Sequence, residues 1–223
     1  MTATEPGRDC PFCPRLVAFR ETWRAAEPGW YNAPVPTFGT LDARLLVVGL
    51  APGLRGANRT GRPFTGDYAG DLLYRTLIDF GFARGRYEAR PDDGLTLSDA
   101  AITNAVRCVP PANKPLPVEI RTCRQFLSAT IAAMPRLRVI VALGRVAHES
   151  VAAAQGLRQK AVPFGHGAVH ALEAAVTLHD SYHCSRYNTN TGVLTEEMFR
   201  AVFAEVRRRV DAEIGQGASS LST

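Results

Sequence analysis

The sequence has only two lysines, Lys114 and Lys160, and no apolar run long enough to span a membrane. Its first residues, MTATEPGRDC, lack the apolar core of a signal peptide. We therefore expect a cytoplasmic protein with no membrane partner. The scarcity of lysine also leaves no obvious amine for chemistry that passes through a Schiff base.

Composition indicates a globular protein, because hydrophobic residues make up 46% of the 223 residues. This length suits one α/β domain over residues 1–223, with residues 1–7 and 215–223 expected to be flexible. The net charge of +5 is compatible with a polyanionic partner such as nucleic acid, and equally with a solvated basic surface. We expect a monomer.

Four of the five cysteines form two pairs about a hundred residues apart. Cys10 and Cys13 form a Cys-x2-Cys, and Cys108 and Cys123 flank a proline-rich segment. Cytosolic thiols are kept reduced, which favours a metal site over disulfides. Four thiolates are what a [4Fe–4S] cluster or a structural zinc ion requires, and the spacing alone does not distinguish the two.

Short apolar runs alternate with amphipathic segments along the chain. Strands are predicted at 44–49, 101–106, 139–144 and 174–178, and helices at 15–23, 68–80, 119–134, 145–154 and 195–214. This alternation predicts a parallel sheet covered by helices on both faces. Loops 50–67, 108–116 and 179–192 all follow strands, so we expect them to build one pocket at the carboxyl edge of the sheet.

Three motifs in these loops carry a family resemblance. GLAPG followed by ANRTGRPFTGD, then TNAVRCVPPANKPLP, and then SYHCSRYNTNTG resemble, in this order, the motifs of family 5 of the uracil-DNA glycosylase superfamily, a branch with an iron–sulfur cluster. The resemblance runs from Cys10 to the final helix. It implies a three-layer αβα sandwich with a short, mainly parallel central sheet. It also favours a [4Fe–4S] cluster held by Cys10, Cys13, Cys108 and Cys123.

Excision of a base requires a surface for the flipped base, a group that reads its edge, and help for an anionic leaving group. Phe64 is the candidate stacking surface, with a core phenylalanine as the alternative. Asn113 has an amide that suits O4 and N3–H of uracil, with a turn asparagine as the alternative. His183 is the candidate for stabilising the departing anion at O2. Asn104 is interpreted as a structural residue at a strand end.

The position that carries an acid in family 4 is Leu50 here, a loss that family 5 shares. The resemblance suggests that Asp67 compensates as the catalytic carboxylate, and the alternative is an N-cap for the next helix. Gly49, Leu50 and Ala51 are expected to contact the substrate.

Ser185, Arg186, Tyr187 and Asn188 are expected to contact DNA, because the corresponding superfamily loop enters the duplex. Cys184 is interpreted as a spare thiol. His179 stays a weaker candidate than His183. A helix-face position is expected for His148, and His166 and His170 have no motif support.

The resemblance implies a monofunctional glycosylase that excises uracil from double-stranded DNA in base excision repair and leaves an abasic site. With Leu50 in place of an acid, other deaminated bases such as hypoxanthine or xanthine are plausible substrates. Two alternatives remain: a noncatalytic nucleic-acid-binding protein stabilised by zinc or a cluster, and a cluster protein for electron transfer. A nucleoid-associated location in the cytoplasm follows from the first hypothesis.

Overall fold

A six-stranded sheet forms the centre of the computed structural model, which describes residues 4–219, with side chains described through residue 212. Four of its strands are parallel neighbours and the two edge strands run antiparallel to them. The strand order is β1 (Phe38–Gly39), β5 (Ala100–Asn104), β2 (Leu45–Gly49), β6 (Val139–Leu143), β8 (Thr177–Ser181) and β7 (Val169–Ala171). The predicted, mainly parallel sheet is confirmed.

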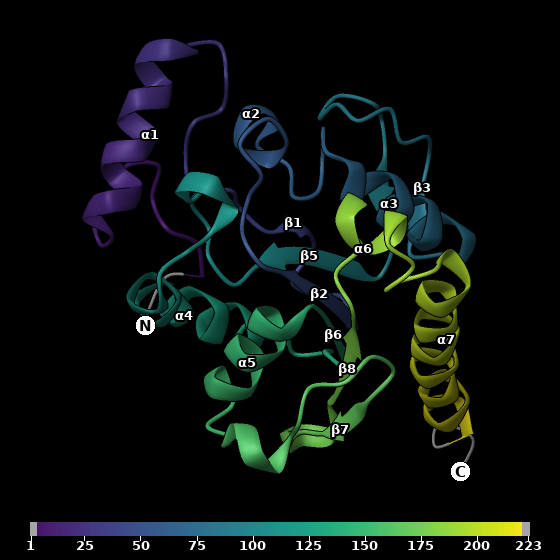
Figure 1. Cartoon of the computed structure of the whole chain (residues 1–223). Coiled ribbons are helices and arrows are strands. Elements are labelled where there is room, and N and C mark those ends of the chain that lie inside the picture. Colours follow the sequence, from purple (N-terminus) through teal and green to yellow (C-terminus); the bar gives the residue numbers. More distant parts are fainter. Residues whose placement is uncertain (1–3, 220–223) are drawn as a thin grey trace.

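Helices cover both faces of this sheet, as Figure 1 shows. One face packs against α3 (Tyr68–Asp79) and α7 (Glu196–Ser219), and the other against α4 (Pro117–Ala132) and α5 (Arg145–Ala154). Strand residues alternate between the two cores: Val47 and Val141 belong to the first, and Leu46 and Ile140 to the second. The predicted three-layer αβα sandwich is therefore confirmed.

Smaller elements lie around the sandwich. Helix α1 (Pro14–Ala26) packs beside the start of α4 through the cysteine pairs. The short elements are α2 (Ala57–Thr60), α6 (Arg186–Asn190), the hairpin β3 (Ala83–Arg84) and β4 (Thr96–Leu97), and the 3-10 turns η1 (Pro111–Asn113), η2 (Gln159–Ala161) and η3 (Glu173–Ala175). No helix among the described residues is long and apolar enough to cross a membrane.

Several sequence predictions need correction. The strand predicted at 174–178 lies at Thr177–Ser181, because the polar His179 and Asp180 are buried in it. The loop predicted at 179–192 contains α6, which Ser185 caps by accepting a hydrogen bond from the Asn188 backbone N–H. The proline-rich segment after Cys108 forms the single turn η1.

The final helix reaches Ser219, beyond its predicted end near residue 214. The predicted flexibility of residues 1–7 and 215–223 stays a prediction, and residues 1–3 and 220–223 lie outside the described residues. Within the first segment, Glu5 accepts a hydrogen bond from the buried Arg107 guanidinium at 2.7 Å.

Candidate active site

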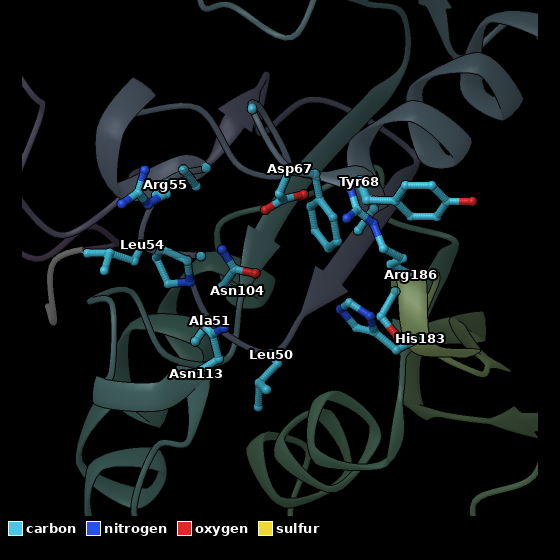
Figure 2. A pocket seen from close by; sticks show the side chains of 18 residues that line it. Leu50, Ala51, Leu54, Arg55, Asp67, Tyr68, Asn104, Asn113, His183 and Arg186 are labelled. Atoms are coloured by element: carbon cyan, nitrogen blue, oxygen red, sulfur yellow. The ribbon is translucent and has the colours of Figure 1, made fainter. Parts of the chain in front are cut away.

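A cavity of about 620 Å³ opens at the carboxyl edge of the sheet. Its walls come from the segments that follow β2, β5 and β8, as the sequence predicted (Figure 2). The described residues that line it are Leu50, Ala51, Pro52, Gly53, Leu54, Arg55, Gly56, Ala57, Phe64, Gly66, Asp67, Tyr68, Ala69, Asn104, Asn113, His183, Ser185 and Arg186. The cavity therefore joins residues more than a hundred positions apart in the sequence.

Phe64 forms part of the cavity wall in a backbone conformation that non-glycine residues seldom adopt. Its φ is +54°, and the side chain is 6% exposed. Tyr87 donates a hydrogen bond to the Phe64 carbonyl oxygen at 3.0 Å, and Tyr74 donates one to the Pro63 carbonyl oxygen at 2.5 Å. Such strain persists only where surrounding contacts determine the backbone. These two hydroxyls hold the peptides on either side of Phe64.

Gly49 lies behind the Phe64 ring and does not line the cavity. A Cβ at position 49 would lie 2.6 Å from a ring carbon of Phe64 and 2.5 Å from Oδ1 of Asn104. The glycine that ends β2 therefore lets the ring approach the backbone closely. Gly49 thus helps to position the Phe64 ring, and its expected contact with substrate stays a prediction.

His183 faces the cavity from the segment after β8. Its ring stacks near the Phe64 ring, with centroids 6.1 Å apart and an interplanar angle of 27°. Burial lowers the pKa of His183 to about 4, so the imidazole is neutral near pH 7. A neutral imidazole still carries one N–H that can stabilise a developing anion. The Asn188 side-chain amide donates to the His183 carbonyl oxygen at 2.8 Å and so helps to fix this residue.

Asp67 lines the cavity at the start of α3. It occupies the N-cap position but makes no side-chain capping hydrogen bond, and its buried Oδ1 has no hydrogen-bond partner among the described residues. Burial raises the pKa of the Asp67 carboxyl, while the backbone amides of Gly70 and Ala69 oppose this shift. One buried oxygen of the carboxylate is thus left without a partner, which is costly for a purely structural residue.

The loop after β2 contains glycines where the Asp67 carboxyl packs against it. A Cβ at Gly56 would lie 2.5 Å from Asp67 Oδ2, and one at Gly53 would lie 3.0 Å from the same atom. Both positions therefore favour a residue without a side chain. The carboxyl thus packs against the backbone at Gly53 and Gly56.

Two asparagines point toward the cavity from β5 and the segment after it (Figure 2). Asn113 ends η1 with φ of +55° and is exposed, while Asn104 ends β5 and is 2% exposed. Neither side-chain amide has a hydrogen-bond partner among the described residues. The sequence alone indicates a structural role for Asn104, because no motif distinguishes it from other strand ends, yet it lines the cavity.

The DNA-contact residues predicted after His183 divide into two groups. Ser185 and Arg186 line the cavity, and the Arg186 guanidinium lies 5.2 Å from the Tyr68 ring centroid. Tyr187 lies outside the cavity lining and is 74% exposed. Asn188 also lies outside it and uses its amide to hold the His183 backbone. Arg55 adds a second exposed cation among the lining residues, which sequence reasoning missed.

The other histidines lie away from the cavity. His179 is 1% exposed and contacts the Thr177 hydroxyl at 3.1 Å. His148 is buried on α5 and contacts Asp180.

Cys184 is fully buried, and its thiol donates to the Ala69 carbonyl oxygen at 3.5 Å. This spare thiol packs in the core beside the cavity wall.

The remaining four cysteines come together around one small apolar hollow beside α1 and α4, and they share one hydrophobic cluster. The Arg107 backbone N–H donates to Cys123 Sγ at 3.3 Å, a contact typical of a ligating thiolate. Four free thiols around one hollow are a ligand set that a [4Fe–4S] cluster or a zinc ion requires.

The cysteine site is tied to the Asn113 turn. Arg15, two residues after Cys13, donates to the Glu119 carboxylate at 2.7 and 2.8 Å and to the Lys114 carbonyl oxygen at 3.1 Å. Glu119 in turn accepts from the Leu116 backbone N–H at 2.7 Å. The segment from Lys114 to Glu119 is therefore fixed to the N-terminal cysteine pair.

The sandwich and its cavity define an α/β protein with a binding site of about 620 Å³ at the carboxyl edge of the sheet. A family model described as the uracil DNA glycosylase superfamily matches residues 36–207, and the chain belongs to this superfamily. A type-5 uracil-DNA glycosylase from Thermus thermophilus is 49% identical over 205 residues, covering 89% of this chain and 93% of the relative. The chain belongs to this type-5 branch.

More distant relatives agree with this placement. A type-5 uracil-DNA glycosylase from Pyrobaculum aerophilum is 40% identical over 211 residues, covering 93% of this chain and 90% of the relative. A type-4 uracil-DNA glycosylase from Archaeoglobus fulgidus is 36% identical over 118 residues, covering 52% of this chain and 51% of the relative. The type-5 similarity covers nearly the whole chain, whereas the type-4 similarity covers about half of it.

Proposed function

We propose that this chain is a monofunctional DNA glycosylase that excises uracil from double-stranded DNA in base excision repair and leaves an abasic site. The observation that carries the proposal is the convergence of Phe64, Asn113 and His183 on one cavity, although they lie on loops after three different strands. A volume of about 620 Å³ accommodates a flipped nucleobase with its sugar. No lysine lines the cavity among the described residues, which supports hydrolysis without a Schiff base.

The extruded uracil stacks on the Phe64 ring, which the strained backbone holds at the cavity wall. The Asn113 amide reads O4 and N3–H by accepting from N3–H and donating to O4, and Asn104 adds a second amide at the cavity wall. Cytosine presents the opposite pattern at these two positions. The polar groups thus select the base, and the ring supplies stacking energy.

The C1′–N1 bond breaks with its electron pair passing to the base, which leaves as an anion with charge on O2. The neutral His183 imidazole donates its N–H to this oxygen, and its low pKa keeps it from being a charged acid. The Asp67 carboxylate stabilises the cationic sugar and orients the water whose oxygen bonds to C1′. This water loses a proton to solvent as the bond forms, and the departing base takes a proton from solvent.

Basic and aromatic groups near the cavity suit a duplex. Arg55 and Arg186 are exposed cations among the lining residues and contact phosphates, together with the Ser185 hydroxyl. Tyr187, exposed next to them, fills the gap left by the flipped base. The protein acts as a monomer and a single domain, and its substrate places it with the nucleoid in the cytoplasm.

Cys10, Cys13, Cys108 and Cys123 would hold a [4Fe–4S] cluster, because all four thiols surround one hollow and the type-5 relatives support this group over zinc. When bound, the cluster would cross-link the N-terminus to the middle of the fold. The residues around it hold the Asn113 turn through Arg15 and Lys114. Brown colour with broad visible absorption of the purified protein would support this assignment, and a colourless protein with one zinc at sulfur would refute it.

Excision from a panel of duplexes, each with one damaged base, tests the proposed function. We expect release of free uracil, and Leu50 in place of an acid predicts release of hypoxanthine and xanthine as well. A noncatalytic nucleic-acid-binding protein would bind some of these duplexes without releasing a base, and an electron-transfer protein would release none. No release from any duplex would overturn the proposal.

Replacement of Asn113 by alanine is expected to lower uracil excision about 10–100-fold relative to excision of the other bases in the panel. The reason is that loss of a paired amide leaves the uracil edge unpaired, at a cost of about 1–3 kcal/mol. Single-turnover rates for each base give the ratio. An unchanged ratio in this variant, with a changed ratio in Asn104→Ala, would transfer the reading role to Asn104.

Tyr87→Phe is expected to lower single-turnover excision about five- to tenfold without unfolding the protein. The substitution removes the hydroxyl that donates to the Phe64 carbonyl oxygen and accepts from Gly66 N–H at 3.4 Å, so the strained backbone at Phe64 can relax. The matched control is Tyr31→Phe, which removes a hydroxyl bonded to the Pro34 carbonyl oxygen away from the cavity lining. Equal rates in both variants would remove Tyr87 from the positioning of Phe64.

A further inference from the structure

A second cluster of metal-binding side chains lies outside the active-site cavity and the four cysteines. His148 comes from α5, His170 from β7 and Asp180 from β8. One donor atom of each lies within 4.8 Å of the others. His148 and Asp180 are at most 1% exposed, and the His170 side chain is 13% exposed. Side chains from three different elements thus form one largely buried polar cluster.

A neutral His148 ring cannot donate a hydrogen bond to both of the groups that it contacts. Its Nδ1 lies 2.7 Å from Asp180 Oδ1, and its Nε2 lies 2.7 Å from the Val162 carbonyl oxygen. Both partners are acceptors when Asp180 is ionised, and a neutral imidazole has a single N–H. Either the ring carries a second proton, or a cation takes the place of that proton on the Asp180 side.

His170 separates these two possibilities. Its Nε2 is buried without a hydrogen-bond partner and lies 3.5 Å from Asp180 Oδ2. An imidazolium–carboxylate pair between His148 and Asp180 leaves this nitrogen unsatisfied, which is costly in a buried site. A distance of 3.5 Å is about what two ligands at ~2.0–2.1 Å from one tetrahedral zinc ion show. A shared cation therefore accounts for all three side chains.

We propose that His148 Nδ1, His170 Nε2 and the Asp180 carboxylate bind a divalent transition-metal ion, for which Zn²⁺ is the best match. Two imidazoles and one carboxylate are zinc ligands, and they leave a fourth position for water. Two further hydrogen bonds would orient these ligands. His148 Nε2–H donates to the Val162 carbonyl oxygen, and Gly165 N–H donates to Asp180 Oδ2 at 3.3 Å. To bind one ion, His148 Nδ1 and Asp180 Oδ1, now 2.7 Å apart, have to move apart by less than an ångström.

The position of the site has a consequence for the end of β8. A cavity of about 230 Å³ lies beside the His148 ligand and is lined by His148, Val162 and Phe164. Asp180 precedes His183 by three residues in the chain, and Tyr182 N–H between them donates to His166 Nδ1 at 3.1 Å. The ion would fix the end of β8 and the start of the His183 segment. Its role is structural, because none of its ligands lines the active-site cavity.

The test uses the purified, iron-containing protein without a metal-binding tag. The protein is incubated with one equivalent of zinc sulfate and gel-filtered, and its zinc and iron contents are measured by plasma mass spectrometry. We expect about one zinc ion per chain, with nitrogen and oxygen ligands and no sulfur in the zinc-edge X-ray absorption spectrum. Zinc should also raise the melting temperature of the wild type.

Variants locate the ion. His170→Ala and Asp180→Asn should each lower the retained zinc at least tenfold and abolish the zinc-dependent rise in melting temperature, with iron unchanged. His166→Ala removes a neighbouring histidine outside the cluster and should retain zinc. The proposal is overturned if the wild type retains no more zinc than His170→Ala, or if its zinc has only sulfur ligands. The wild-type spectrum decides the question even if a variant fails to fold.

Discussion

Replacing His183 with alanine is expected to slow single-turnover release of uracil about 10²–10³-fold. Loss of one preorganised donor to a developing anion has an effect of this size in other enzymes. The His183 ring has no hydrogen-bond partner among the described residues and faces the cavity beside Phe64, so its N–H is available for substrate. The measurement is a rapid-quench time course with enzyme in excess over a uracil-containing duplex.

The matched control for His183 is His179, the other histidine of the same motif. It is buried, bonds to Thr177 and does not line the cavity, so His179→Gln should keep its single-turnover rate at temperatures well below its melting point. A large loss in His179→Gln together with a wild-type rate in His183→Ala would exchange their roles.

The pH profile tests the protonation state of His183. Because burial lowers its pKa to about 4, its ring stays neutral from about pH 5.5 to 8 and should contribute no titration in that range. A step in the wild-type rate near pH 6.5 that disappears in His183→Ala would contradict a neutral electrophile. A profile with the same shape in both proteins would agree with it.

The sequence predicted the sandwich because each central strand is a continuous apolar run. Residues 139–143 are all buried, as a strand covered on both faces requires. The amphipathic helix predicted at 68–80 corresponds closely to α3, whose buried leucines recur at helical spacing. These elements depend on local pattern, and local pattern is what a single sequence contains.

The strand that contains Asp180 was misplaced for a tertiary reason. A strand was expected to end where the polar residues begin, yet Asp180 is fully buried because His148 on α5 and the Gly165 backbone satisfy its carboxylate. These partners are remote in sequence. No periodicity could have indicated that a charged residue at this position belongs to the core.

Sequence motifs in the loops predicted some residues of the candidate site. Residues that reach the site only through tertiary packing were missed. Phe64, Asn113 and His183 came from the family motifs, and they line one cavity. Asn104 ends a buried strand like any other, and Tyr87 lies in a loop without a motif, so only the fold reveals that they lie beside Phe64. Contacts of this kind are set by tertiary geometry, which spacing does not encode.

Asp67→Asn is expected to slow single-turnover excision by about 100-fold or more while raising the melting temperature. A carboxylate that assists at the reacting sugar contributes about 10²–10⁴-fold, and an amide cannot replace its charge. The stability gain comes from burial, which raises the pKa of Asp67 in the folded state. Ionising this carboxyl therefore opposes folding at every pH above its unfolded pKa, and asparagine removes that opposition.

The change in melting temperature caused by Asp67→Asn should depend on pH. Below the unfolded pKa of about 4, Asp67 is protonated in both states, and the variant should melt near the wild-type temperature. As pH rises through the raised folded pKa, the variant should become relatively more stable, and above it the difference should stay constant, at about 2–4 °C for each kcal/mol. The control is Asp71→Asn, which replaces the other acid at the start of α3. This variant should keep the wild-type rate of single-turnover excision. A variant that melts lower at neutral pH and keeps wild-type excision would show that Asp67 serves only as the cap of α3, and that charge on the sugar is stabilised by other groups of the cavity.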